Sequence, residues 1–302
     1  MSAPSAVEVT VPASTANLGS GFDALGMALS LYDTVHAEVV DGPPGSVRVD
    51  VEGCGAGAVP ADERHLVARM AHLALADAGA RRPALHLRCR NAIPHSRGLG
   101  SSAAAIVAGV AAGYALAGIS LADKESTDRA LQLAAAEEGH ADNAAASLFG
   151  GFVIAWNDGG RFGATSLRPL PDVVPVAFVP AVESATRTTR GLLPEQVPHA
   201  DAAFAAGRAA LLVHALTADP SLLLAATADR LHQDYREPAW PDTIALVRRL
   251  RAAGVPAAVS GAGPTVLAFP EGGEVPTGIE HNGFDPLRLR VDGEGVRTTV
   301  KS

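Results

Sequence analysis

Hydrophobic positions in several segments of the chain follow the period of β-strands. Val7, Val9 and Val11 alternate with polar residues, as in a half-buried strand, and Pro12 is expected to end this strand. A glycine-rich turn is predicted at residues 15–26. Similar apolar segments between turn signals predict strands at 32–40, 46–53, 84–90, 148–156 and 173–180, a pair within 255–270, and late strands at 287–293 and 296–300.

Other segments carry apolar residues at helical spacing. Leu66, Met70, Leu73 and Ala74 share one face of a helix that is expected to end at Gly79. Further helices are predicted at residues 101–118, 123–138, 204–216, 222–231 and 243–253. Because strands and helices are mixed without a regular strand–helix–strand repeat, the predicted fold class is α+β.

One stretch, "NAIPHSRGLGSSAAAIVAGV" from Asn91 to Val110, allows three interpretations. As a membrane span, residues 101–122 carry no charge and contain GxxxG, but they consist mainly of Ala, Gly and Ser, which drive insertion poorly. As a dinucleotide site, Gly98, Gly100 and Ala103 fit GxGxxA, but seven residues separate the glycines from the preceding strand. Both interpretations are therefore disfavoured.

The third interpretation is an anion-binding loop at the start of a helix. Gly98 and Gly100 let the backbone approach a ligand closely, and Ser101 and Ser102 lie at the first helical turn, where free amides face an anion. Arg97 adds a positive charge beside the turn. A lysine-armed P-loop is excluded because no GxxxxGK[ST] pattern occurs and the only lysines are Lys124 and Lys301.

The composition narrows the class of protein. The chain has 302 residues, 48% of them hydrophobic and 19% charged, which suits one large or two closely packed domains, and the polar bend at 157–164 predicts a boundary between 1–158 and 159–302. A net charge of −8 without a basic run disfavours nucleic acid as a partner.

Cys54 and Cys89 stand alone, so neither a disulfide framework nor a zinc site is indicated. The N-terminal segment lacks the features of a signal peptide, and we expect a cytoplasmic protein.

The whole segment "IPHSRGLGSSAA", residues 93–104, resembles the phosphate loop of the GHMP kinases, the superfamily of galactokinase, homoserine kinase, mevalonate kinase and phosphomevalonate kinase. Within the superfamily, "VPASTANLGSGFDALGMALSLYD", "EGHADNAAASLFGG" and "VSGAGPTVLAF" resemble homoserine kinases, and the "GEH" of the sugar and mevalonate kinases is missing. The matches extend from Val11 to Phe269. They imply a two-domain GHMP kinase fold with a nucleotide-binding domain at 1–158, a C-terminal domain at 159–302 and the active site in the cleft between them.

The resemblance also implies a reaction, transfer of the ATP γ-phosphoryl group to the side-chain hydroxyl of L-homoserine with Mg²⁺, by an enzyme that is expected to be a homodimer without membrane contact. It places Asn17 and Asp23 on the amino acid, Asp23 at its ammonium, and Arg190 and Arg236 on its carboxylate. The implied residues beside the substrate pocket are His140 and Asn143, and the implied magnesium ligands are Glu138 with Ser101 or Ser102. The ATP-binding residues would be Pro94, His95, Ser96, Arg97, Gly98, Leu99, Gly100, Ser101, Ser102, Ala103 and Ala104.

Several of these assignments compete with purely structural roles. Asn17 and Asp23 could serve only turn hydrogen bonds, and His140 could cap a helix. The segment "SGAGPT", residues 260–265, could be a tight hairpin or contact the ligand. His65 stands where the family commonly has an asparagine near the adenine, which leaves the base contacts open.

Three other functions compete with the predicted reaction. They are a nicotinamide oxidoreductase, a non-catalytic ATP-binding module, and a kinase for another hydroxylated acceptor. No general base is predicted, because Asp23 is committed to the ammonium group and a loose transition state requires little activation of the nucleophile. Arg187, outside the aligned position, is expected on the surface.

Overall fold

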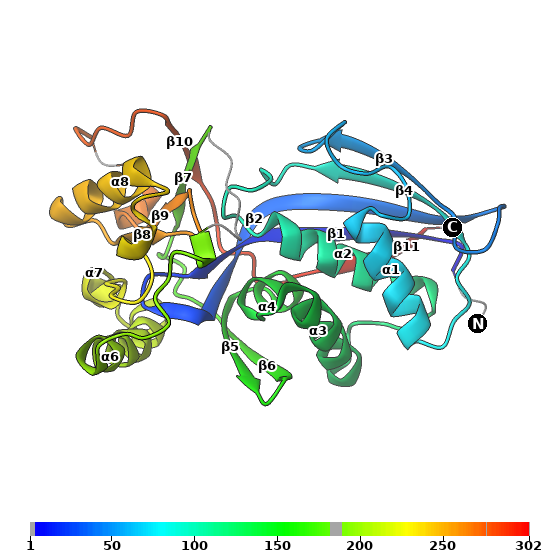
Figure 1. The fold of residues 1–302 in the computed structure, drawn as a ribbon, viewed down its shortest axis with the longest axis horizontal. Coiled ribbons are helices and arrows are strands. Elements are labelled where there is room, and N and C mark those ends of the chain that lie inside the picture. The colour runs from blue at the N-terminus through cyan, green and yellow to red at the C-terminus, as the bar shows by residue number, and fades with distance from the viewer. Residues whose placement is uncertain (1–3, 182–188, 276, 302) are drawn as a thin grey trace.

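The computed structural model describes residues 4–181, 189–275 and 277–301, and Arg187 therefore lies outside the described residues. They form two β-sheets with helices beside each (Figure 1). The larger sheet has the order β11-β1-β2-β4-β3, and β5 and β6 continue it from β2. Its strands are β1 (Ala6–Asn17), β2 (Gly21–Val40), β3 (Val47–Gly53), β4 (Ala84–Asn91), β5 (Phe152–Asp158), β6 (Arg161–Leu167) and β11 (Arg297–Lys301). The smaller sheet has the order β10-β7-β9-β8, with β7 (Val176–Pro180), β8 (Ala257–Val259), β9 (Val266–Ala268) and β10 (Phe284–Arg288).

The helices divide between the two sheets. Beside the larger sheet lie α1 (Leu66–Asp77), α2 (Ser101–Leu116), α3 (Lys124–Glu138) and α4 (Asp142–Phe149). Beside the smaller sheet lie α6 (His199–Thr217), α7 (Leu223–Ala226) and α8 (Pro241–Ala252). This mixture of helices with mainly antiparallel sheets, in which only β3 and β4 pair in parallel among the described residues, confirms the predicted α+β class. The β1–β2 hairpin joins the two halves, because its tip extends toward α6 and α7 (Figure 1).

The first strand is longer than the sequence predicts. β1 does not end at Pro12 but continues to Asn17, with Pro12 opposite Tyr32 and a register shift directly after it. This irregularity explains how a residue without a backbone N–H is tolerated inside the strand. The extension matters for function, because it carries the chain from the sheet to the tip of the hairpin.

The alanine-rich helix α2 is a buried core helix. A Cβ at Gly109 would lie 2.5 Å from the carbonyl oxygen of Val67, and one at Gly113 would overlap the carbonyl of Ala71, both in α1. The GxxxG spacing therefore serves close packing between α1 and α2. No helix in the described part of the chain is long and apolar enough to cross a membrane. On the neighbouring α1, Leu73 is 40% exposed, so it does not belong to the buried face predicted for it.

Other predicted elements also differ from the structure. The strand predicted at 148–156 begins only at Phe152, because residues 142–149 form α4, and Gly150 ends this helix with a φ of 70°. The helix predicted at 222–231 is reduced to α7, because the Asp229 carboxylate accepts the N–H groups of the residues that follow it, including His232 and Gln233. Such side-chain acceptors compete with the helical backbone pattern.

The bend predicted at 157–164 consists mainly of strand residues, and only residues 159–160 form the turn of a hairpin. β5 and β6 pair across it, and both belong to the larger sheet. The C-terminal strand β11 also returns to this sheet and pairs with β1. The division of the chain into 1–158 and 159–302 stays a prediction.

Candidate active site

The glycine–serine motif lies in the loop between β4 and α2. The backbone adopts positive φ values three times, 54° at Ser96, 79° at Gly98 and 67° at Gly100. A Cβ at Gly98 would lie 2.5 Å from the carbonyl oxygen of Ser260, and one at Gly100 would overlap Ser14 Oγ. Both the backbone conformation and the close neighbours therefore require glycine at 98 and 100.

The helix that follows presents its first turn to a cavity. Ser101 and Ser102 line this cavity, and the first backbone hydrogen bond of the helix runs from the Ala104 N–H to the Gly100 carbonyl. The N–H groups of Ser101, Ser102 and Ala103 precede that bond. Together with the positive end of the helix dipole they suit an anion.

The loop between β8 and β9 supports the glycine–serine motif from the other side. Ser260 Oγ donates to the Gly98 carbonyl at 2.5 Å and lies 2.8 Å from Thr15 Oγ1. The Thr265 N–H donates to the Arg97 carbonyl at 3.2 Å. The segment 260–265 is thus a turn between two strands, and its Gly261 and Ala262 line the cavity, while its contact with a ligand stays a prediction.

The cavity, of about 150 Å³, collects residues from distant parts of the chain. Every residue predicted to bind the acceptor or the metal ion lines it, together with part of the predicted phosphate loop. These lining residues are Asn17, Asp23, Ser96, Gly98, Gly100, Ser101, Ser102, Glu138, His140, Asn143, Arg190 and Arg236.

Arg97 is directed away from the place expected for it. Its guanidinium donates to the carbonyls of His95, Pro180 and Ala181, at 3.1, 3.0 and 2.6 Å. Because these carbonyls hold the side chain at the end of β7, its charge stabilises the loop against the smaller sheet. The amides at the start of α2 therefore remain as the main anion-binding groups of the motif.

An ion pair spans one end of the cavity. Arg190 Nη1 and Nη2 donate to the two carboxylate oxygens of Asp23 at 3.1 and 2.7 Å. The side chains are 46% and 33% exposed, respectively. The turn before Asp23 is fixed by Asn17, whose Oδ1 accepts the Asp23 N–H at 3.0 Å and whose Nδ2 donates to the Gly261 carbonyl at 2.9 Å. Asn17 therefore makes the turn hydrogen bonds while it lines the cavity.

Arg236 lines the same cavity and is only 2% exposed. Its Nη1 donates to His232 Nδ1 at 2.7 Å and to the Gly261 carbonyl at 3.0 Å. Burial, with repulsion from Arg190, lowers the pKa of Arg236 to about 10, so the guanidinium stays charged at neutral pH. Its buried Nε has no partner among the described residues and can donate to a ligand.

An acidic and a basic side chain lie where α3 ends and α4 begins. His140 Nδ1 lies 2.7 Å from Asp142 Oδ1, which also accepts the Asn143 N–H at 2.7 Å. Burial acts to lower the pKa of His140, but the hydrogen bond to Asp142 and the charges of Asp142, Glu138 and Asp23 outweigh it and raise the pKa to about 9. His140 is therefore protonated at neutral pH. It pairs with a carboxylate instead of capping a helix.

Glu138 faces this histidine and the start of α2. Burial raises the pKa of Glu138, while the charge of His140 and a hydrogen bond from Ser102 act to lower it. The neighbouring Glu137 instead pairs with Arg69 Nη2 at 2.6 Å. Of the two adjacent glutamates, Glu138 is thus the one that lines the cavity.

A second cavity of about 290 Å³ adjoins the first one. The two share Ser96, Ser101 and Ser102, and His95 and Ala104 of the predicted loop line the second. Leu99 and Ala103 are buried beneath the loop, and Pro94 is half-buried. The further walls of the second cavity are largely apolar and include Val35, Val59, Pro60, His65, Leu66, Val67 and Ala108.

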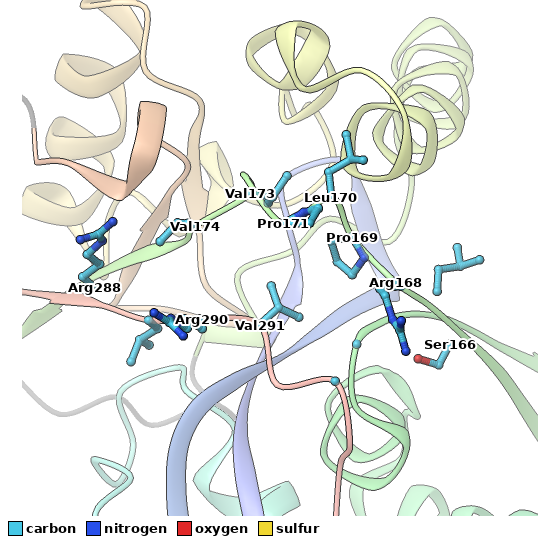
Figure 2. Close-up of a pocket in the computed structure, with 14 residues that line it drawn as sticks. Ser166, Arg168, Pro169, Leu170, Pro171, Val173, Val174, Arg288, Arg290 and Val291 are labelled. Carbon is cyan, nitrogen blue, oxygen red and sulfur yellow. The ribbon is translucent and has the colours of Figure 1, made fainter.

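A larger cavity, of about 850 Å³, lies between the connections that join the two sheets (Figure 2). Figure 2 shows Arg288 and Arg290 on one side and Arg168 on the other, with the apolar residues Pro171, Val173 and Val291 between them. It has no carboxylate or histidine among its lining residues. The 150 Å³ cavity combines a helix N-terminus, carboxylates and guanidinium groups, so it is the better candidate for the active site.

Sequence reasoning missed three residues that organise the site. Asp142 pairs with His140, Ser14 Oγ donates to Asn143 Oδ1 at 3.1 Å, and His232 accepts from Arg236. Ser14 and Asp142 lie inside the segments "VPASTANLGSGFDALGMALSLYD" and "EGHADNAAASLFGG", and His232 lies four residues before Arg236, so their positions were an available signal.

The family model and the relatives found by comparison with known proteins all point to the same family. The GHMP kinases N terminal domain matches residues 65–151. A homoserine kinase of Streptomyces avermitilis is 50% identical over 293 residues, 96% of this chain and 95% of that protein. A homoserine kinase of Mycolicibacterium vanbaalenii is 48% identical over 298 residues, covering 96% and 93%. The crystal structure of homoserine kinase from Cytophaga hutchinsonii superposes with a TM-score of 0.85 at 26% identity and covers 99% of each chain.

Proposed function

Because the chain belongs to the homoserine kinase family of the GHMP kinases, we propose that it transfers the γ-phosphoryl group of ATP to the side-chain hydroxyl of L-homoserine, through the residues of the 150 Å³ cavity. The products are O-phospho-L-homoserine, an intermediate of threonine biosynthesis, and ADP. The observation that carries the assignment of the site is the shared cavity. The first turn of α2 and the Asp23–Arg190 pair line the same cavity.

ATP occupies both adjoining cavities in this proposal. The triphosphate lies on the amides from Gly98 to Ser102, and the adenine enters the apolar cavity lined by Val35, Val67 and His65. Burial lowers the pKa of His65, so its ring is neutral and can stack on or hydrogen-bond to a base. His65 Nδ1 is buried without a partner among the described residues, which leaves it available to the nucleotide.

The residues present also fit a magnesium ion. Glu138 offers a carboxylate that accepts a hydrogen bond from the hydroxyl of Ser102, and Ser101 lines the same cavity. In the described ranges no three His, Cys, Asp or Glu side chains form a metal cluster, and Mg²⁺ commonly binds one or two carboxylates together with phosphate oxygens. Such an ion would offset the negative charge of the phosphates.

The acceptor is held by opposite charges. Homoserine carries an ammonium and a carboxylate, and Asp23 and Arg190 offer one partner for each. Without substrate these two side chains neutralise one another, and a zwitterion can replace both halves of that pair. Arg236 adds a second guanidinium for the carboxylate. A ligand with only one of the two charges would leave Asp23 or Arg190 without a counter-charge.

Catalysis in this site comes from positioning. Asp23 is engaged with a cation, and His140 is already protonated, so neither is free to take the hydroxyl proton at neutral pH. A loose transition state makes little demand on a base. Alignment of the hydroxyl with the phosphoryl group and charge stabilisation by the helix N-terminus therefore supply most of the rate enhancement.

The compartment and the assembly are further parts of the proposal. A cytoplasmic homodimer is what the family resemblance implies. Light scattering of the purified protein tests the assembly, and a mass of 30.7 kDa would mark a monomer.

The function is tested by an ADP-release assay across homoserine, serine, threonine, mevalonate and galactose. The expected result is a kcat/KM for homoserine that exceeds all the others. Preference for another acceptor would overturn the substrate assignment. ATP binding without ADP release from any of them would indicate a binding module, and binding of a nicotinamide cofactor instead of ATP would indicate an oxidoreductase.

A further inference from the structure

We propose that His232 is a positioning residue that orients Arg236 so that one edge of its guanidinium faces the substrate carboxylate. This inference rests on the proposed role of Arg236. His232 does not line the substrate cavity and lies directly behind Arg236, at zero exposure.

The hydrogen bonds of His232 determine its tautomer. Nε2 lies 2.8 Å from the Gly19 carbonyl oxygen, which can only accept, so Nε2 carries the hydrogen. Nδ1 then has a free lone pair and accepts the hydrogen bond from Arg236 Nη1 at 2.7 Å. Burial lowers the pKa of His232, although Asp229 acts in the opposite direction, so the ring keeps this neutral form.

The ring itself is held from three sides, by the Gly19 carbonyl, by Arg236 Nη1 and by Phe22, on which it stacks with centroids 5.2 Å apart. The Asp229 carboxylate fixes the backbone at this residue by accepting the main-chain N–H of His232 at 3.0 Å. Phe22 directly precedes Asp23, and Gly19 belongs to the same hairpin tip. His232 therefore connects the hairpin that carries Asp23 to the guanidinium of Arg236.

The consequence for Arg236 follows from counting its donors. Nη1 carries two hydrogens, and both are used, one by His232 Nδ1 and the other by the Gly261 carbonyl. Nε is buried and has no partner within the described part of the chain. Nε and Nη2 form one edge of a guanidinium, which matches the two oxygens of a carboxylate. His232 thus helps to hold Nη1 in the protein and leaves the opposite edge for the ligand.

Two amide substitutions distinguish the roles of the two ring nitrogens of His232. His232→Asn places an amide near Nδ1, where its oxygen can still accept from Arg236. His232→Gln reaches toward Nε2, where it can donate to Gly19, but it leaves Arg236 without an acceptor. We expect His232→Gln to raise the KM for homoserine about tenfold or more, the usual effect of losing a hydrogen bond to a charged group, with the KM for ATP unchanged. His232→Asn should recover most of that loss.

Two controls separate positioning from a general structural role. His72→Gln introduces the same amide at another buried histidine, in α1, and should leave the KM for homoserine unchanged. In the Arg236→Met background, His232→Gln should add no further rise in this KM, because the group that it positions is gone. Thermal unfolding of each variant shows whether the loss of affinity follows the loss of stability.

The outcomes distinguish this inference from the proposed function. Equal effects of the Asn and Gln variants, or an undiminished effect of His232→Gln without Arg236, would overturn the positioning role. If Arg236→Met raises the KM for homoserine and His232→Gln does not, this inference fails and the proposed function stands. If Arg236→Met itself leaves this KM unchanged, the carboxylate-binding role of Arg236 fails, and with it the role of His232.

Discussion

The two ends of the proposed active site are built in different ways. At the phosphate end, backbone amides bind the ligand, and the glycines that expose them are in close contact with Ser14 and Ser260. At the acceptor end, charged side chains from four segments meet, and Asp23 and Arg190 are partly exposed. A backbone site is set by the local chain and changes little on binding, whereas a side-chain site must first exchange its internal ion pair for the substrate. Substitutions at the phosphate end should therefore lower activity by altering the backbone geometry, and substitutions at the acceptor end should lower activity by weakening the affinity for the acceptor.

The largest effect is expected from Gly100→Ala. A Cβ there would overlap Ser14 Oγ, and the residue has a φ of 67°, so we expect activity to fall by about 100-fold or more, with a loss of stability of about 2 kcal/mol from strain and overpacking. The KM for ATP and the thermal midpoint measure the two effects.

Gly118→Ala is the matched control for this substitution. Gly118 follows the other end of α2 with a φ of 79°, and nothing lies within 4 Å of its would-be Cβ. This variant should lose only about 1 kcal/mol of stability and keep its activity. Full ATP-dependent activity of Gly100→Ala would contradict the assignment of the phosphate end.

At the acceptor end, Asp23→Asn should act mainly on affinity. Removal of the carboxylate charge leaves the substrate ammonium without its partner, and we expect the KM for homoserine to rise roughly tenfold to 100-fold, with a smaller change in kcat. Steady-state kinetics with each substrate varied separately measure this division. A collapse of kcat at unchanged KM would instead show that Asp23 acts as the general base.

The difference between the two ends also explains what the sequence could predict. The glycines, the serines and the start of α2 are local features, and the structure places them as expected. The residues of the acceptor end were identified by family resemblance, but their arrangement depends on contacts such as that between Asp23 and Arg190, 167 residues apart, which no local pattern encodes. The direction of the Arg97 side chain could not be predicted for the same reason, because two of the carbonyls that hold it lie 83 and 84 residues further on.

Local patterns also failed where two structures fit one short segment. The strand predicted at 148–156 began too early, because Leu148 and Phe149 form the end of α4, and so short an apolar segment does not separate the helical period from the strand period. The helix predicted at 222–231 was too long, because the carboxylate of Asp229 redirects the backbone. That turn brings His232 into hydrogen-bond contact with Arg236, so the early end of the helix contributes to the arrangement of the proposed substrate site.

A smaller effect is expected from pH at the junction of the two ends, where His140 lies. Its pKa is raised from the usual 6.5 to about 9, so its paired, protonated form stabilises the fold fully below pH 6.5, and this contribution is lost as the pH rises through 9. The shift corresponds to roughly 3 kcal/mol at most. Chemical denaturation between pH 6 and 10 should therefore show a fall in the free energy of unfolding that His140→Gln reduces. An identical pH dependence in both proteins would show that another group is responsible.

The smallest effect is expected outside both ends, in the 850 Å³ cavity of Figure 2. Arg168→Gln and Arg290→Gln each remove a positive charge from its walls. The lining residues include neither the first turn of a helix, which would bind a triphosphate, nor a carboxylate, which would pair with the ammonium group of a zwitterion. The KM values for ATP and homoserine should stay within about twofold of the original protein, because neither arginine lines the 150 Å³ or the 290 Å³ cavity. If either substitution raised a KM as much as Asp23→Asn does, cavity size would outweigh the arrangement of charges as a guide to the active site. The contrast between a backbone end and a side-chain end would then describe the wrong cavity.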